Sequence, residues 1–558
     1  MKQSCIMVAN GDLRLPANQG TWATQLRAEQ AVVRAAASFG ADVKRGFDVD
    51  PVEGHGFIKS QKHGMEVFRQ IPRDAPLIVV ETVWQYSQHI LAGLLSHRGP
   101  ILTVANWSGE WPGLVGLLNL NACLSKLGVP FSTLWSETFE DEWFLSNLEQ
   151  WLDGKPVIHD TSHVRCLSEF EIPGDAERVA DGVVSNLLEN KAILGVFDEG
   201  CMGMYNAIVP DELLSPIGIF KERLSQSALY YAMTQISDEE AGHVRRWLDR
   251  KGVQFRIGSN PENDLTDRQV LEQCKMYIAA LRIADDFGCD AIGIQYQQGL
   301  KDLVPASDLV EGLLNNCDRP PVQSKVNGLT LFEGKALPHF NEVDECAGVD
   351  ALLTNRIWTR LGLDPETTLH DIRYGEDFEV DGETEFVWTF EISGAVPPQH
   401  LTGGYEGVEC VRQPTMTFRM GGATIKGISK PGEVIWSRIF VEDNRLKADI
   451  GRAKAVELPR DESERRWQLT NWQWPMMHAV LFGITRDQMM ARHKSNHIQV
   501  AYAPDTRSAN RALAAKAAAF ASLGIEVNIC GTEHGLEPKV AASSEVETPV
   551  GVAHQGLE

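Results

Sequence analysis

The chain has 558 residues, of which 43% are apolar and 23% charged, and its formal net charge is −24. This length exceeds what one hydrophobic core supports and predicts two to four domains. The negative charge argues against a nucleic-acid partner, because a surface that binds nucleic acid must attract phosphate groups.

The sequence predicts neither export nor a membrane partner. Its first residues, MKQSCIMVANG, contain one lysine and a very short apolar run, unlike a secretory signal. No window approaches the roughly 18 consecutive apolar residues of a membrane-spanning helix. The ten cysteines, from Cys5 to Cys530, form no CxxC pair, which is typical of reduced thiols. We therefore expect a cytoplasmic protein.

Residues 1–168 alternate strand-like and helix-like segments. The short apolar runs APLIVVETVW, GPILTVANW and GVPFSTLW are bounded by Pro or Gly and predict strands. The stretches between them, QYSQHILAGLLSHR and GLVGLLNLNACLSKLG, have helical spacing. This rhythm predicts an N-terminal α/β domain with a parallel sheet covered by helices.

A second α/β domain is predicted over residues 169–358, after a polar stretch. KAILGVFDEG and CDAIGIQYQQG are its predicted strands, and DEEAGHVRRWLDRKG and DRQVLEQCKMYIAALRIADDFG are its predicted helices. Its last helix follows PHFNEVDE, which contains Glu342.

The pattern then becomes β-rich over residues 359–535, which carry Asp371 and His497. Segments such as ETEFVWTFEISG and GEVIWSRIFVED are rich in β-branched and aromatic residues and predict antiparallel strands in a small barrel or sandwich. Residues 536–558 are polar and predict a disordered tail. The predicted fold is α/β, with two N-terminal α/β domains with parallel sheets followed by a β-rich C-terminal domain.

Negative charge is concentrated in front of the apolar helix that ends the second domain, at Glu342, Asp344 and Glu345. Acidic residues suit a helix N-terminus because of its exposed N–H groups and its macrodipole, and Asn341 is the expected cap. Taken alone, the cluster therefore predicts a helix start.

Together with two other residues, Glu342 suggests a metal site. Asp371 in LHDIRYG and His497 in SNHIQVAYA also lie at the ends of predicted elements, where sites on α/β scaffolds collect. Singly, each has an ordinary explanation: Asp371 can pair with Arg373, and a histidine at a strand edge is usually inert. As a set, two carboxylates and one imidazole favour Mn²⁺, Mg²⁺ or another divalent ion. His370 is a rival ligand, but in a strand it would point the other way.

At these positions the chain resembles the L-fucose isomerase family. FNEVDE, LHDIRYG and SNHIQVAY resemble the three family segments that ligate the metal, and VETVWQYSQ, NWSGEWPG, GCMGMYNAI and AIGIQYQQG resemble further family stretches in the same order. The likeness covers most of the chain. It implies two α/β units, a β-rich C-terminal domain that supplies the histidine, and a hexamer, which is a homo-oligomer.

The resemblance implies an aldose–ketose isomerase that acts on a deoxyhexose or pentose of the L-fucose or D-arabinose type through a cis-enediol. Glu342 and Asp371 would be catalytic, and both would ligate Mn²⁺, or Mg²⁺ or Co²⁺, together with His497. Gln295 and Asn496 would hydrogen-bond sugar hydroxyls, Trp84 would stack on the sugar, and Met202 would shape the pocket. Core packing is the alternative for Trp84 and Met202, and a strand cap is the alternative for Asn496.

Some residues depart from the family pattern. Tyr405, Trp472 and Trp474 are all candidates for the pocket aromatic, and Arg14 lies in an N-terminal segment that differs from the family's. Two other functions stay open: a metal-dependent lyase or hydrolase acting on a polyhydroxy substrate, and a non-catalytic sugar-binding protein.

Overall fold

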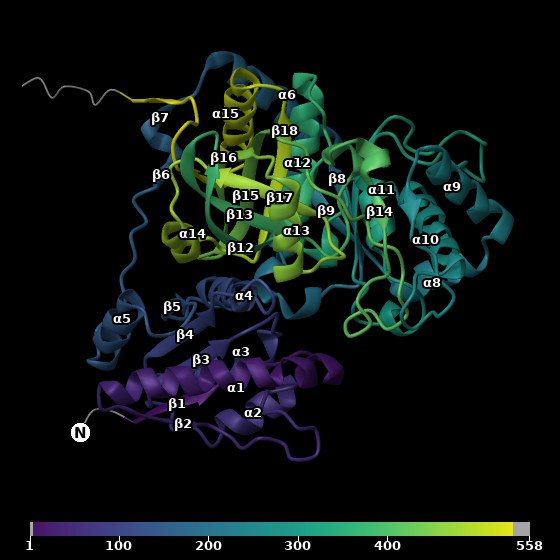
Figure 1. Cartoon of the computed structure of the whole chain (residues 1–558). Helices are drawn as coiled ribbons and strands as arrows, with labels where there is room; N and C mark the ends of the chain where they lie inside the picture. Colours follow the sequence, from purple (N-terminus) through teal and green to yellow (C-terminus); the bar gives the residue numbers. More distant parts are fainter. Residues whose placement is uncertain (1–3, 540–558) are drawn as a thin grey trace, which may run out of the picture.

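The computed structural model describes residues 4–539 and has the predicted α/β fold. Its first part is a five-stranded sheet in the order β2-β1-β3-β4-β5, with every pairing parallel. Figure 1 shows this layer, in purple and blue, below the rest of the chain. Its strands are β1 Ser4–Val8, β2 Asp42–Arg45, β3 Leu77–Glu81, β4 Ile101–Asn106 and β5 Ser132–Ser136, and its helices are α1 Leu15–Ser38, α2 Gln61–Phe68, α3 Gln88–Ser96, α4 Gly113–Lys126 and α5 Glu142–Leu152.

Both faces of this sheet are buried, which explains why its strands read as continuous apolar runs. Along β3, Ile78 and Val80 pack into one core, and Leu77 and Val79 pack into the core on the other face. This alternation follows from the two-residue period of a strand.

The second part contains the parallel sheet β11-β8-β9. Its strands are β8 Ala192–Phe197, β9 Ile219–Leu224 and β11 Ala291–Ile294, and its helices are α6 Gly174–Asn190, α7 Asp211–Leu214, α8 Gln226–Thr234, α9 Asp238–Arg250, α10 Asp267–Asp286, α11 Asp308–Asn315 and α12 Glu345–Leu361. Five 3₁₀ turns belong here: η2 Cys201–Gly203, η3 Tyr205–Ala207, η4 Ser215–Ile217, η5 Leu300–Asp302 and η6 Asn341–Val343. The short strand β10 Gln254–Phe255 pairs with β14 Glu409–Cys410 of the third part.

The C-terminal part is an antiparallel barrel extended by two further strands. The sheet order is β15-β18-β12-β13-β17-β16-β19-β6, and an additional pairing of β15 with β16 closes the first six strands into a ring. The ring strands are β12 Thr368–Val380, β13 Glu383–Glu391, β15 Gly432–Glu442, β16 Arg445–Ala455, β17 Met476–Leu481 and β18 His497–Ala503. The other elements are β19 Glu526–Cys530, α13 Arg460–Leu469, α14 Arg486–Arg492, α15 Thr506–Ser522, and the 3₁₀ turns η7 Pro398–His400 and η8 Gly404–Gly407.

Several contacts cross the predicted domain boundaries. Strand β6 (Val164–Cys166), which precedes the boundary at 168, pairs with β19, and the η1 turn Leu167–Glu169 follows it. Helices α6 and α15 pack together in one core that joins the second and third parts. Strand β20 (Glu537–Pro538) pairs with β7 (Phe170–Glu171), while residues 540–558 of the predicted tail lie outside the described residues.

Within residues 4–539, no helix combines the length and apolarity that a membrane crossing requires. No disulfide joins the nine cysteines that are described individually.

A buried ion pair ties the C-terminal helix to the barrel and to α12. The Lys516 ammonium donates to Asp350 Oδ1 at 2.7 Å, to Thr354 Oγ1 at 2.8 Å and to Ser437 Oγ at 2.5 Å. Both ionic side chains are at most 1% exposed, so neither can be solvated if its partner is removed.

We predict that Lys516→Met lowers the free energy of unfolding by about 3–5 kcal/mol, because it leaves the Asp350 carboxylate buried without its cation. Chemical denaturation followed by circular dichroism measures the loss. The double variant Lys516→Met/Asp350→Leu should recover most of it, and a double variant as unstable as the single one would contradict this explanation.

Candidate metal centre

Glu342 lies in a strained turn directly before α12. Its φ is 57°, a left-handed conformation that costs about 1–3 kcal/mol for a residue other than glycine. The preceding segment runs parallel to β11 through a bridge between Ile292 and His339. Gln295, which follows β11, donates from Nε2 to the Glu342 carbonyl at 3.2 Å. The surrounding structure therefore holds the turn and sets the direction of the Glu342 side chain.

The helix cap differs from the sequence prediction, which was wrong for Asn341. Asp344 is the N-cap of α12 and accepts a hydrogen bond from the Ala347 N–H at 3.0 Å. Asn341 belongs to the separate 3₁₀ turn, and its side chain donates to buried Glu311. The left-handed residues Glu342 and Val343 interrupt the helical geometry, so the helix begins three residues later than predicted.

Asp371 and His497 are directly opposite each other on neighbouring antiparallel strands, β12 and β18. Opposite residues on paired strands have side chains close enough to interact. His497 Nε2 lies 3.5 Å from Asp371 Oδ1 and 3.7 Å from Glu342 Oε2. The structure thus brings together three side chains that are far apart in the sequence.

A second interaction of Asp344 orients His497. The carboxylate oxygen Oδ2 of Asp344 lies 2.8 Å from His497 Nδ1 and 2.6 Å from Arg438 Nη1, and all three side chains are at most 1% exposed. Burial would raise the pKa of Asp344, but Arg438 and His497 outweigh burial and lower it below its ordinary value. The ionised Asp344 therefore fixes the proton of His497 on Nδ1 and leaves Nε2 directed at the two other carboxylates.

The three residues fit a divalent cation. His497 Nε2 is buried and has no hydrogen-bond partner among residues 4–539. Ligand atoms around one ion lie roughly 3–4 Å apart, since each is about 2.0–2.2 Å from it, and both separations from Nε2 fall in this range. The two carboxylates are further from each other than from the imidazole, so a carboxylate side chain must turn inward to complete a site.

Electrostatics at the trio also favour a cation. Burial raises the pKa of Glu342 to about 7, and Asp371 adds to this shift while His497 opposes it. Burial lowers the pKa of His497, but the hydrogen bond that it donates to Asp344 and the charges of Asp371, Asp344 and Glu342 together raise it. When no cation is bound, protons on these groups offset the negative charge of the carboxylates.

Glu342 and Asp371 form part of the wall of a cavity between the first layer and the barrel, and His497 lies behind them. Asn496, Trp84 and Met202 line it, and Asn496 Nδ2 donates to Asp371 Oδ1 at 2.8 Å. Gln295 is fully buried and lies behind this wall, with Oε1 accepting from the Gln297 N–H at 3.1 Å. Among the sequence candidates for sugar contact, Gln295 is thus engaged with the protein itself.

Of the three aromatic candidates, only Trp474 lines this cavity. Trp472 is 46% exposed and lies against the Lys426 ammonium. Tyr405 donates its hydroxyl to the Asp318 carbonyl at 2.5 Å and packs on Trp247.

Several lining residues were not singled out from the sequence as site residues. Arg14, the residue in the divergent N-terminal segment, donates to Gln297 Oε1 at 2.9 Å and to the Thr417 carbonyl at 3.2 Å. Arg373 lies 3.5 Å from Glu391 and donates to Asn471 at 2.6 Å, in place of the predicted partner Asp371. The remaining lining residues are Val115, Ser393 and Phe418. In the sequence, Gln297 and Arg373 each follow a predicted site residue, Gln295 or Asp371, by two positions, and this spacing is the feature that could have identified them.

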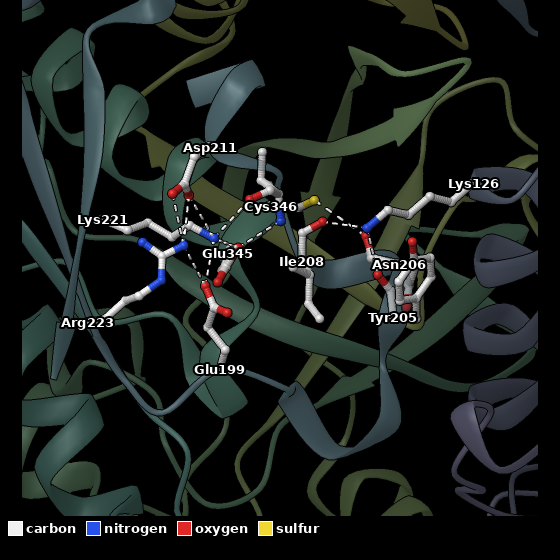
Figure 2. Close-up of polar contacts among 11 residues, drawn as sticks. Lys126, Glu199, Tyr205, Asn206, Ile208, Asp211, Lys221, Arg223, Glu345 and Cys346 are labelled. Carbon is white, nitrogen blue, oxygen red and sulfur yellow. Dashed lines mark hydrogen bonds and ion pairs between the residues drawn. The ribbon is translucent and has the colours of Figure 1, made fainter. Parts of the chain in front are cut away.

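Two lysines anchor the turn that carries Met202, as Figure 2 shows for the segment from Glu199 to Asp211. Lys221 is 3.0 Å from Glu345 and 2.9 Å from Glu199, and Lys126 of α4 donates to the Tyr205 carbonyl at 2.8 Å. Glu345 is the first residue of α12, next to Asp344. The start of α12 therefore positions the cavity wall through Glu345 and the imidazole of His497 through Asp344.

No protein-family model matches this chain, and no curated protein matches it at a significant level.

We predict that Asp344→Asn weakens binding of Mn²⁺ by about 10–100-fold, because the imidazole loses the partner that sets its tautomer. Isothermal titration calorimetry on chelator-treated protein measures the affinity. Asp350→Asn is the matched control, since it alters another buried, ion-paired aspartate of α12. Equal affinities of the Asp344→Asn variant and the unmodified protein would contradict the assignment.

Binding of Mn²⁺ should strengthen as the pH rises through about 7. Below that pH Glu342 holds a proton, and the pKa of His497 is also raised above its usual value, so a cation must displace protons to bind. Titrations in buffers with different ionisation enthalpies should reveal proton release on binding. In Glu342→Gln the pH dependence should become shallower, and a pH-independent affinity in the unmodified protein would contradict this account.

Proposed function

We propose that the protein is a metal-dependent aldose–ketose isomerase acting on a deoxyhexose or pentose of the L-fucose or D-arabinose type. The observation that carries the proposal is that Glu342 and Asp371, both in the wall of a cavity, approach the oriented Nε2 of His497. The resemblance in sequence at these same three segments supports the choice of reaction.

A divalent ion held by these residues would polarise the substrate carbonyl and acidify the neighbouring C–H bond. Glu342 suits proton transfer between the two carbons, because its carboxylate lines the cavity beside the imidazole of His497. Asn496 restrains Asp371 by donating a hydrogen bond to its carboxylate. His497 stays a fixed ligand, because Asp344 occupies its other ring nitrogen.

The cavity offers both apolar and polar surfaces to a sugar. Trp84 and Trp474 supply aromatic faces of the kind that pack against the C–H face of a sugar ring. Arg14 and Gln297 supply polar atoms on the lining. We assign the hydrogen bonds to sugar hydroxyls to Gln297 and Asn496, with Gln295 holding the Glu342 turn in place.

Mn²⁺ is the metal we propose, and Mg²⁺ or Co²⁺ would accept the same nitrogen and oxygen ligands. The proposal includes a cytoplasmic location, in keeping with the absence of disulfides among the nine cysteines described. It also includes the homo-hexamer that the family resemblance implies.

We predict that Glu342→Gln and Asp371→Asn each lower kcat/KM for aldose–ketose conversion by about 10²–10⁴-fold, through loss of acid–base function. The assay supplies Mn²⁺ to chelator-treated protein and follows a panel of sugars by NMR in D₂O, where isomerisation should place deuterium at the carbon next to the carbonyl. His370→Gln changes a buried residue beside Asp371 on the same strand, whose ring packs near Phe390, and should retain turnover.

The outcomes separate the alternatives. Full turnover in both carboxylate variants would remove the assignment. A cleaved or dehydrated product would indicate a lyase or hydrolase, and sugar binding that survives chelation without turnover would indicate a binding protein.

A further inference from the structure

A second group of metal-ligating side chains lies outside the candidate metal centre. Asp364 and Glu366 lie in the connection between α12 and β12, and His400 ends the turn η7. Each offers one ligand atom, and the three atoms lie within 4.8 Å of one another. Thr368 of β12 contacts His400, and Asp371 is three residues further, roughly 10 Å along the strand.

Two of the three side chains have a buried ligand atom without a partner. His400 uses Nδ1 to contact Thr368 Oγ1 at 2.6 Å, and its Nε2 has no hydrogen-bond partner in the described part of the chain. Glu366 uses Oε1 to accept from the Cys317 N–H at 2.6 Å, and its Oε2 is likewise without a partner. His400 is 0% and Glu366 2% exposed, so solvent does not supply the missing contacts.

The two carboxyl groups also lack an ion-paired counter-charge. Within residues 4–539, no ion pair joins Asp364 or Glu366 to a basic side chain. Lys430 is the nearby cation, and its ammonium lies over the Tyr502 ring at 5.0 Å. Burial and Asp364 raise the pKa of Glu366 to about 8, and burial lowers the pKa of His400 well below its usual value. Two carboxyl groups and a neutral imidazole thus meet where a cation would stabilise them.

We propose that Asp364, Glu366 and His400 bind a divalent transition-metal ion in a structural site separate from the candidate metal centre, and we choose Zn²⁺ as the ion with which to probe it. One imidazole and two carboxylates are ligands that Zn²⁺ accepts, and half-buried Asp364 gives the ion a route from solvent. The ion would clamp the start of β12 to η7. This proposal does not depend on the proposed isomerase activity.

Another buried histidine provides a matched control. His478 contacts Ser463 Oγ through Nε2 at 3.1 Å, and its Nδ1 has no partner among the described residues. His400 and His478 thus share their burial, a hydroxyl contact and one free nitrogen. Of the two, only His400 belongs to a described three-residue ligand group.

The test uses full-length protein carrying Glu342→Gln and His497→Gln, so that the candidate metal centre lacks two ligands. After chelator treatment, the protein is titrated with Zn²⁺, and bound zinc is measured by mass spectrometry alongside the melting temperature. We expect one zinc ion per chain and a rise in melting temperature. Adding His400→Gln or Asp364→Asn should weaken binding at least tenfold and abolish the rise, whereas adding His478→Gln should do neither.

The proposal is overturned if the background protein binds no zinc, or if both added ligand variants bind it as tightly as the background does. Should His400→Gln fail to fold, Asp364→Asn decides the matter, because Asp364 is only partly buried and its replacement is isosteric. Circular dichroism of each variant checks that the fold is retained.

Discussion

The Asp344 carboxylate joins three structural elements at one buried point. It caps α12, pairs with Arg438 of β15 and holds Nδ1 of His497 on β18. An ionised carboxylate without exposure is stable only when its partners are complete, so helix, barrel and histidine must be positioned together. The remaining site follows from this constraint: Glu342 lies two residues before Asp344, and Asp371 faces His497 across the strand pair.

Local patterns predict the elements on which the site residues lie, but not how these residues meet. The alternation in LHDIRYG and NHIQVAY predicts two strands, which are present as β12 and β18. The register that sets Asp371 opposite His497 depends on closing the barrel, which involves pairings between distant segments that no local pattern encodes. The left-handed turn at Glu342 is equally invisible, because a glutamate gives no sign of such a conformation.

The side chains around the cavity illustrate the same limit. Trp472 and Trp474 lie two residues apart and look equivalent in sequence, yet Trp474 lines the cavity and Trp472 faces solvent. Gln295 and Gln297 also differ in their partners. Gln295 donates a hydrogen bond to the Glu342 carbonyl, whereas Gln297 accepts one from Arg14. Such choices depend on contacts with other parts of the chain.

The pairing of β6 with β19 has a consequence for how this protein can be divided. The short strand Val164–Cys166 leaves the N-terminal layer and completes the far edge of the C-terminal sheet. Cutting the polypeptide after residue 168 would therefore strip the downstream fragment of an edge strand and expose the backbone of β19 to unwanted pairing. The three parts are not independent units, and a fragment meant to keep the eight-stranded C-terminal sheet complete has to begin upstream of residue 164.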